Sequence, residues 1–405
     1  MRDHFLSLYL HLPFCHHKCS YCDLNAYAGL NDLIPAYVAA LADEIRLVGR
    51  GTDSVVHTIY FGGGTPSLTP LPLLGELFAA IHSSFATTAD LEISFEANPE
   101  TLTDEYLLGL RQLGINRLSI GAQSAQPSEL ALFQRTHTFE DVVQALCAAR
   151  QAGFENISLD LIYGIPGQTL ARWQDTFTKM LALAPDHFSV YALSYDFNTP
   201  MRAWIQRGLL AEPAGELAAE MYEWADEVLL AAGYGQYEIS SWAKNRKHAK
   251  RAEGRMQTVT EMPTDFQCRH NLQYWRNQPY LGLGAGAHGY LGSYRYANIA
   301  SPSAYVERMK AAERPAFPFS PALQSSIEVD GDTEMKETLL TGLRLLPEGV
   351  SAIDFHRRFG LSLADVFESD LRDLLQKELI VWEGDRLKLT RGARLVSNWV
   401  FERFV

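Results

Sequence analysis

Residues 12–27, LPFCHHKCSYCDLNAY, place Cys15, Cys19 and Cys22 within eight positions. Three thiolates at the spacing C-x3-C-x2-C on one short loop can hold a metal centre and leave one coordination position free. Leu24 stands where a fourth cysteine would complete the set. The segment therefore predicts a metal site that keeps an open position.

Zinc is the alternative occupant of this site, with His11, His16 or His17 as its fourth ligand. Zinc sites usually combine two separated Cys or Cys/His clusters, and the sequence has no second cluster where that pattern would place it. Spacing alone therefore favours another metal centre over zinc, and both remain open at this point.

The composition is that of a globular, intracellular protein. The 405 residues are 47% hydrophobic and carry a net charge of −13, which argues against general nucleic-acid binding because that mode needs a basic surface. No run has the length of a transmembrane helix, and the N-terminus lacks signal-peptide features, so we expect a cytoplasmic location. Five cysteines do not form a secreted disulfide framework, and Cys147 is predicted to be a buried apolar thiol.

Strand-like and helix-like patterns alternate along the first half of the chain. Helical spacing over 34–48 and a capping-box pattern from Thr138 to Asp141 mark two of the helices. Such alternation predicts a parallel sheet, either doubly wound or curled into a full or partial barrel. The six strand-like runs are LSLYLHL (6–12), VVHTIYF (55–61), LEISFEA (91–97), RLSIGA (117–122), ISLDLIY (157–163) and FSVYAL (188–193).

Polar and glycine-rich residues gather at the ends of these runs. The cysteines follow the first run, GGGTP (62–66) the second, Glu96 and Asn98 the third and Gln123 the fourth, while Asp160 lies within the fifth. Because the carboxyl ends of parallel strands meet at one edge, the placement predicts an active site there.

At these residues the sequence resembles the radical S-adenosylmethionine superfamily, in which the same cysteine spacing holds a [4Fe–4S] cluster. The resemblance implies a partial (β/α)6 TIM-like barrel and a cluster whose open iron binds S-adenosylmethionine for reductive cleavage of its sulfonium. YFGGGTPS, FEANPE, RLSIGAQS and DLIYGIPGQT also resemble the subgroup that contains oxygen-independent coproporphyrinogen III oxidase and the HemW haem chaperones. By motif position, the implied contacts of S-adenosylmethionine are Tyr9, Gly63, Gly64, Thr65, Glu96, Gln123, Arg135 and Asp160.

Two departures separate the chain from the oxidase pattern. Leu24 replaces the additional cysteine, and only fourteen residues precede Cys15. HNLQYW (270–275) matches the HNxxYW motif of the haem chaperones, which implies that His270 ligates haem iron. Read without the resemblance, His270 is an ordinary hydrogen-bonded histidine, and Cys268 is a structural thiol that could also ligate iron.

The resemblance thus implies a haem chaperone that binds a [4Fe–4S] cluster, S-adenosylmethionine and haem, and transfers haem to respiratory haem proteins. It also implies a homodimer and peripheral contact with the membrane through partners. Whether S-adenosylmethionine is cleaved is left open. The alternatives are oxygen-independent coproporphyrinogen III oxidase and another radical S-adenosylmethionine enzyme.

Three domains are expected: the barrel over 1–235, a less regular connecting region over 236–319 and an α+β domain over 320–405. LIVWEGDRLKLTRGARLV (379–396) resembles the strand–turn–strand of a winged-helix-like domain, and the family resemblance implies a domain like the C-terminal part of the oxidase. Residues 244–267 are rich in Lys, Arg and Gln and predict a solvated surface loop, with contact to an anionic partner as the minor alternative.

Overall fold

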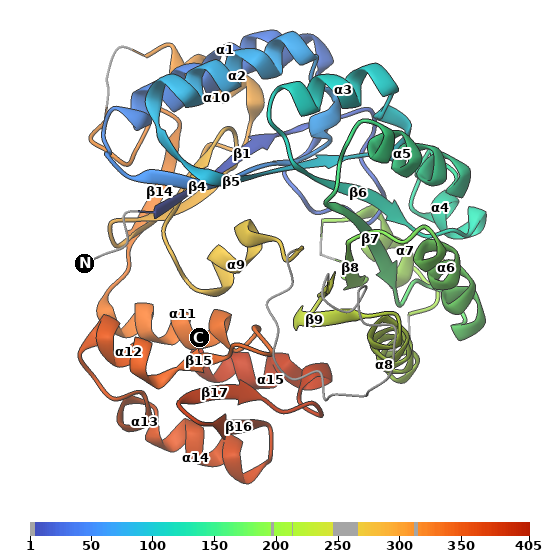
Figure 1. Ribbon diagram of the computed structural model, residues 1–405, viewed down its shortest axis with the longest axis vertical. Helices are drawn as coiled ribbons and strands as arrows, with labels where there is room; N and C mark the ends of the chain where they lie inside the picture. Colours follow the sequence, from blue (N-terminus) through green and yellow to red (C-terminus); the bar gives the residue numbers. More distant parts are fainter. Residues whose placement is uncertain (1–4, 196–197, 213, 246–265, 312–314) are drawn as a thin grey trace. The chain divides into compact units, whose positions relative to one another are not determined.

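Six parallel strands lie side by side in the order in which they occur along the chain. All six correspond to the strand-like runs of the sequence, and helices connect them along the outer side of the sheet (Figure 1). The predicted partial (β/α)6 barrel is therefore confirmed. The strands are β1 (Phe5–Leu12), β4 (Val55–Gly63), β5 (Ala86–Ala97), β6 (Arg117–Gln123), β7 (Ile157–Tyr163) and β8 (His187–Ala192).

This computed structural model describes residues 5–195, 198–212, 214–245, 266–311 and 315–405. Spatial contacts divide the chain into two units. The barrel unit consists of Met1–Tyr222 and Pro279–Glu328, and the second unit consists of Glu223–Gln278 and Val329–Val405. The boundaries expected from sequence, after residues 235 and 319, stay a prediction.

Several helices of the barrel unit begin at residues whose side chains cap the first turn. The side chain of Thr138 accepts a hydrogen bond from the backbone N–H of Asp141, whose side chain accepts from the Thr138 N–H, as the sequence predicts. The side chains of Thr103, Thr169 and Thr199 each accept a hydrogen bond from a backbone N–H in the first turn of three further helices, without the reciprocal bond. The helices are α1 (Ile34–Gly49), α2 (Leu71–Ser84), α3 (Asp104–Gln112), α4 (Pro127–Leu132), α5 (Phe139–Gln151), α6 (Leu170–Ala182), α7 (Pro200–Gln206) and α10 (Pro302–Met309), with short 3-10 turns at Asn31–Leu33, Pro66–Leu68 and Pro99–Thr101.

The two faces of the strands differ in chemistry. Phe61 on β4 meets Phe78 on α2 with ring centroids 5.3 Å apart, so the apolar face packs against the helices. On the other face, Ser7 and Thr58 hydrogen-bond each other over 2.6 Å, with both side chains buried. Barrel interiors are usually filled by branched apolar side chains, so a polar interior indicates a ligand site rather than a core.

Residues 279–298, expected to be less regular, form strands, and that expectation was wrong. β11 (Tyr280–Leu283) pairs in parallel with β1, and β12 (His288–Leu291), β13 (Tyr294–Asn298) and β14 (Leu323–Glu328) continue the sheet as antiparallel strands. The glycines of this region predict a loop, but in the structure they permit close contact between strands. A Cβ on Gly289 would meet the ring of Tyr296 at 2.2 Å.

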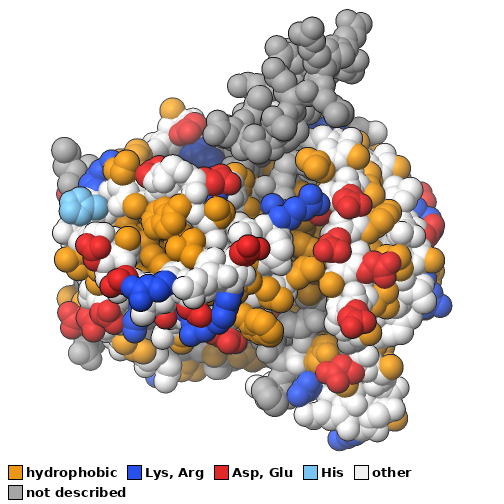
Figure 2. Space-filling view, turned by 90° about the horizontal axis from the view of Figure 1, so that it is seen from below, with side chains coloured by type: hydrophobic (Ala, Val, Ile, Leu, Met, Phe, Trp, Pro, Cys, Tyr) orange, Lys and Arg blue, Asp and Glu red, His pale blue; other side chains and the backbone are white. Residues whose placement is uncertain are grey.

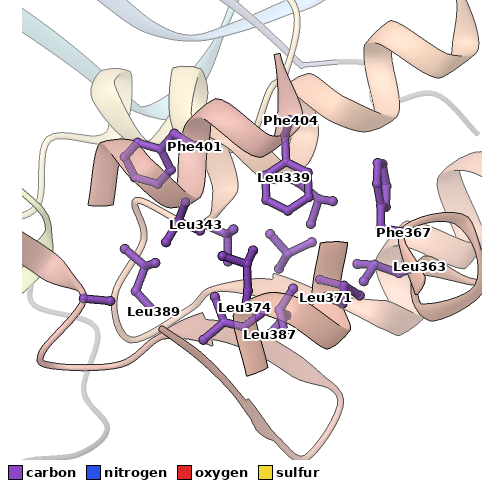
Figure 3. Packing of buried hydrophobic residues seen from close by; sticks show 14 of the residues in the cluster. Leu339, Leu343, Leu363, Phe367, Leu371, Leu374, Leu387, Leu389, Phe401 and Phe404 are labelled. Carbon is purple, nitrogen blue, oxygen red and sulfur yellow. The ribbon is translucent and has the colours of Figure 1, made fainter. Parts of the chain in front are cut away.

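The second unit contains the predicted strand–turn–strand, β16 (Ile380–Glu383) and β17 (Arg386–Leu389), which pairs with β15 (Val350–Ser351). Buried leucine and phenylalanine side chains from its helices form the core over this sheet (Figure 3). The unit contains both helices and strands, as expected for an α+β domain. Its likeness to a winged-helix domain stays a prediction. The other elements are β9 (Tyr234–Glu238), β10 (Ser241–Lys244), α9 (Arg269–Trp275), α11 (Gly331–Gly342), α12 (Ala352–Phe359), α13 (Leu363–Val366), α14 (Glu368–Gln376), α15 (Ser397–Phe401) and 3-10 turns at Arg394–Val396 and Glu402–Phe404, while α8 (Gly215–Ala231) spans the boundary of the units.

Several smaller expectations concern the surface. Cys147 is exposed on α5 rather than buried, because its position faces away from the sheet; the prediction of a buried thiol was wrong. Acidic and basic side chains are interspersed on the face seen in Figure 2. None of the helices in the described ranges has the length and apolar character needed to span a bilayer. Most of the predicted basic loop, residues 246–265, lies outside the described residues.

Candidate cofactor site

The cysteine loop follows the carboxyl end of β1, and the segments before and after the loop pair with each other. Cys15 ends β2 (Phe14–Cys15), which pairs in parallel with β3 (Tyr27–Ala28) after the loop. Within the loop, the Cys22 N–H donates to the Cys19 carbonyl oxygen over 3.2 Å. The Thr65 hydroxyl donates to the Cys15 Sγ over 3.5 Å. The three thiols are therefore presented by a closed loop beside the glycine-rich turn.

The glycine-rich turn packs against this loop without space for side chains. A Cβ on Gly64 would meet the Phe14 carbonyl oxygen at 2.6 Å, and one on Gly63 would meet the His11 ring at 2.8 Å. Gly63 also has a φ of +119°, which L-residues rarely adopt. The Thr65 N–H donates to the Phe14 carbonyl oxygen over 2.7 Å. These glycines are thus required by the contact between the two loops.

A cavity of about 430 Å³ opens at the carboxyl ends of the strands. It is lined by most of the site residues predicted from sequence: Cys15, Cys19, Cys22, Gly63, Gly64, Thr65, Glu96, Gln123, Arg135 and Asp160. Leu24, at the position of the absent cysteine, also lines it. Of the predicted residues, Tyr9 and His270 are not among those lining it. The structure therefore brings together residues that are far apart in the sequence.

Tyr9 lies on β1, two residues before His11. Its hydroxyl donates to the His11 Nδ1 over 3.0 Å, and the His11 Nε2–H donates to the Asn25 carbonyl oxygen over 2.8 Å. The ring of Tyr9 stacks against Tyr60 with centroids 6.2 Å apart. In this arrangement Tyr9 supports the cysteine loop through His11.

Glu96 is a carboxylate held by two donors. The Tyr60 hydroxyl donates to its Oε1 over 2.7 Å, and the Gly63 N–H donates to its Oε2 over 3.2 Å. Burial raises the pKa of Glu96 to about 7, while the Tyr60 hydrogen bond opposes the rise. A carboxylate beside a cavity is suited to binding a cationic group such as an ammonium.

Arg135 connects two strand ends. Its Nε donates to the Gln123 Oε1 over 2.7 Å, and its Nη1 donates to the Asn98 Oδ1 over 3.0 Å. Gly121 permits this, because a Cβ there would meet the Arg135 Nη2 at 2.7 Å. The guanidinium is thus fixed at the cavity wall next to the cysteine loop.

Three thiols on one loop are a ligand set that iron–sulfur clusters use. Among the described residues, no three His, Cys, Asp or Glu side chains are close enough together to hold one metal ion. A cluster of several irons can use thiolates that are farther apart. Burial raises the pKa of the Cys15 thiol, and it raises the pKa of Cys22 to about 11. Loading of a metal centre at these thiols would therefore release protons.

His270 belongs to the second unit, where α9 begins just after Cys268. Its side chain is fully buried, and its Nε2 hydrogen-bonds the Tyr274 hydroxyl over 2.9 Å. Cys268 is also buried, and its N–H donates to the Tyr237 hydroxyl over 3.2 Å. In this conformation neither side chain is open to an incoming ligand.

Sequence reasoning missed three residues that hold the site together. Tyr60 and Ser119 fix the carboxylates of Glu96 and Asp160, and Asn98 was noted at a strand end but not assigned a role. For Tyr60 and Ser119 the signal is alternation, since each occupies an inward strand position in register with a predicted site residue, whereas Asn98 directly follows the end of β5. Ser119, for instance, pairs with Glu96 across β5 and β6.

Comparisons with known proteins show the family of the chain. The family model of the radical SAM superfamily matches residues 9–180, which include the three cysteines and the cavity-lining strands β4 to β7. The chain is 36% identical to the haem chaperone HemW of Bacillus subtilis, over 98% of this chain and 99% of that protein. The chain belongs to the HemW family of radical SAM proteins.

Other relatives of the family extend the likeness. HemW of Escherichia coli is 30% identical over 99% of this chain and 98% of its own. The model of the HemN C-terminal domain matches residues 329–396. Coproporphyrinogen III oxidase (HemN) from Escherichia coli has a similar fold, with a TM-score of 0.81, 24% identity and coverage of 99% of this chain and 90% of that one. At that identity the likeness shows the fold alone.

Proposed function

We propose that this protein is a haem chaperone that binds a [4Fe–4S] cluster, S-adenosylmethionine and haem, and delivers haem to acceptor proteins. The observation that carries the proposal is the 36% identity to a HemW protein over nearly the full length of both chains. Leu24 supports it against the oxidase alternative, because it leaves the loop without a further thiol.

Cys15, Cys19 and Cys22 would hold the cluster, which supplies an open iron for S-adenosylmethionine and an electron for its reduction. Glu96 is the residue suited to the ammonium of S-adenosylmethionine, and Asp160 is suited to hydrogen-bond donors of the same molecule. Gln123 and Arg135 form a joined wall beside them. Gly63, Gly64 and Thr65 keep the turn close to the cysteine loop.

His270 is the proposed axial ligand of haem iron. Because its Nε2 hydrogen-bonds Tyr274 and its ring is buried, binding requires this hydrogen bond to break and the ring to become accessible. Loss of the Tyr274 hydroxyl should therefore ease haem binding, whereas loss of the imidazole should weaken it. These opposite directions separate a ligand from a residue that only supports the fold.

The test is an anaerobic titration of the cluster-loaded protein with haem, followed by Soret absorbance. We expect near-stoichiometric binding by the wild type, at least tenfold weaker binding by His270→Ala and equal or tighter binding by Tyr274→Phe. His356→Ala serves as the control, since His356 is exposed on α12 of the same unit. Transfer is then measured by mixing the haem-loaded protein with an apo-cytochrome of the respiratory chain.

Two outcomes would count against the proposal. If the wild type binds no haem specifically, the chaperone role fails and decarboxylation of coproporphyrinogen III becomes the assay of choice. If all variants bind haem equally, His270 is not the ligand and Cys268 is tested next. We also propose a cytoplasmic location and peripheral contact with membrane-bound acceptors, and cell fractionation tests both. We further propose a homodimer linked to cluster loading, which size-exclusion chromatography of the loaded and unloaded protein tests.

A further inference from the structure

Serines line the barrel interior on four successive strands. Ser94 on β5, Ser119 on β6, Ser158 on β7 and Ser189 on β8 are all buried. The strand register places Ser119 opposite Ser158 on the neighbouring strand. Buried hydroxyls need hydrogen-bond partners, so a group of interior serines indicates a shared polar group.

Three of these serines converge on the carboxylate of Asp160. The Ser119 hydroxyl lies 2.9 Å from its Oδ2, and the Ser158 hydroxyl lies 3.0 Å from its Oδ1. Ser189 on the other neighbouring strand hydrogen-bonds the same carboxylate. Asp160 also lines the cavity, so the carboxylate that these hydroxyls hold lies at the cavity wall.

The direction of these hydrogen bonds follows from the number of protons. Ser158 has one hydroxyl proton, and its oxygen also lies 2.8 Å from the His187 Nδ1. If Ser158 donates to Asp160, then His187 must donate to Ser158 from a protonated Nδ1. Burial holds the pKa of His187 well below its ordinary value, so the neutral ring can carry its one proton there. His187, Ser158 and Asp160 then form one directed chain.

We infer that Ser119, Ser158 and Ser189 are positioning residues that hold Asp160 as an oriented, ionised carboxylate for S-adenosylmethionine. The inference rests on the proposed binding of that cofactor and deepens it. A carboxylate taken out of water must be stabilised by donors, and three hydroxyls fixed on rigid strands supply them before the ligand arrives.

Other charged groups also act on Asp160. Glu96 on β5 opposes its ionisation, and Arg117 on β6 favours it. Tyr21 of the cysteine loop lies near it, and the neutral His187 on β8 is linked to it through Ser158. Burial is the largest effect and raises the pKa of Asp160, whereas the serine hydroxyls lower it. Removal of one hydroxyl should therefore make Asp160 harder to ionise.

Ser94 supplies a matched control. It is buried on the neighbouring strand β5, two residues before the position that pairs with Ser119, and its Oγ has no hydrogen-bond partner among the described residues. The variants are Ser119→Ala, Ser158→Ala, Ser189→Ala and Ser94→Ala, with Asp160→Asn as the reference for a lost carboxylate. Each serine variant removes one hydroxyl oxygen without adding volume. Equal thermal midpoints show that the fold is retained.

The experiment measures S-adenosylmethionine affinity by equilibrium dialysis of the cluster-loaded protein from pH 6 to 8. We expect about tenfold weaker binding for the Ser119 and Ser158 variants, with the loss greatest at low pH, and wild-type affinity for Ser94→Ala. Infrared spectra of the ligand-free protein, taken as a difference against Asp160→Asn, follow the carboxylate directly. Its titration should move to higher pH in the same variants.

The outcomes separate the two claims. If the wild type does not bind S-adenosylmethionine, the proposed function fails, while the infrared titration still reports whether the serines act on Asp160. If the wild type binds and the Ser119, Ser158 and Ser189 variants match Ser94→Ala in both measurements, the positioning role is wrong and the proposed function stands.

Discussion

The Tyr60 hydroxyl donates a 2.7 Å hydrogen bond to Oε1 of Glu96, which joins adjacent parallel strands directly beneath the cofactor cavity. The bond stabilises the ionised form of a carboxyl group whose burial favours the neutral form. Burial and the nearby Asp160 raise the pKa of Glu96 to about 7, against the lowering effect of the Tyr60 and Gly63 hydrogen bonds and of Arg117. This carboxyl group therefore changes its charge near physiological pH.

The first prediction concerns the pH dependence of cofactor binding. The ammonium of S-adenosylmethionine needs the ionised carboxylate, so affinity should rise as the pH passes upward through about 7. Below that pH, affinity should fall by up to about tenfold per pH unit. Tyr60→Phe removes a donor and should shift the profile to higher pH, and Glu96→Gln should flatten this step. An unchanged pH profile of affinity in Tyr60→Phe would show that the Tyr60 hydrogen bond does not lower the pKa of Glu96.

The second prediction concerns the glycine-rich turn. Gly64→Ala places a Cβ 2.6 Å from the Phe14 carbonyl oxygen, which displaces the cysteine loop and should cost about 1–3 kcal/mol of stability. The amount of iron that this variant retains after anaerobic reconstitution should also fall. Gly75→Ala on α2 is the control, because its Cβ meets nothing closer than 4.0 Å. That change should instead stabilise the protein by about 0.5–1 kcal/mol. Equal iron content in both variants would show that the contact is dispensable.

The fold could be predicted from sequence because the strands carry strong local patterns. Leu6, Leu8 and Leu10 alternate with polar residues, and helical spacing follows between the strands. Topology then places strand ends at one edge, so the lining residues Glu96 and Asp160 could be predicted without coordinates. Local pattern and tertiary structure agree in this part of the chain.

Other parts depend on long-range packing that the local pattern does not encode. Gly289 reads as a loop residue until the ring of Tyr296 is seen against it. Ser119 and Tyr60 look like ordinary polar residues of half-buried strands, and their partners lie on neighbouring strands. The burial of His270 likewise depends on the packing of its unit rather than on the motif.

The third prediction concerns Glu44, a buried carboxylate that ties α1 to distant segments of the barrel unit. It accepts hydrogen bonds from Gly284 N–H and the Tyr305 hydroxyl at Oε2, both over 2.7 Å, and from Asn298 and Ser320 at Oε1. Glu44→Gln turns one acceptor into a donor, which leaves two of these donors without an acceptor.

Each buried donor left without an acceptor should lower the free energy of unfolding by about 1–3 kcal/mol. Asp43→Asn is the control, since Asp43 is exposed beside it on the same helix and should change stability by no more than about 0.5 kcal/mol. Urea denaturation measures both. Similar losses in the two variants would mean that the buried hydrogen bonds contribute little.

The last prediction concerns Trp275 of the HNxxYW motif. The Arg344 guanidinium carbon lies 4.3 Å from the centroid of a Trp275 ring, and its Nη2 forms a 3.2 Å ion pair with the buried Glu238. Arg344→Ala removes the cation–π contact and leaves the Glu238 carboxylate unpaired, at a combined cost of about 2–4 kcal/mol.

Arg276→Ala is the control, because its ion pair with Glu348 is more exposed and should be worth about 0–1 kcal/mol. Thermal unfolding and tryptophan fluorescence measure the two effects. Because Arg344 holds the end of α9, its loss should also loosen the helix that carries His270 and speed haem association relative to the Arg276 variant. Equal association rates in the two variants would show that α9 is held without Arg344.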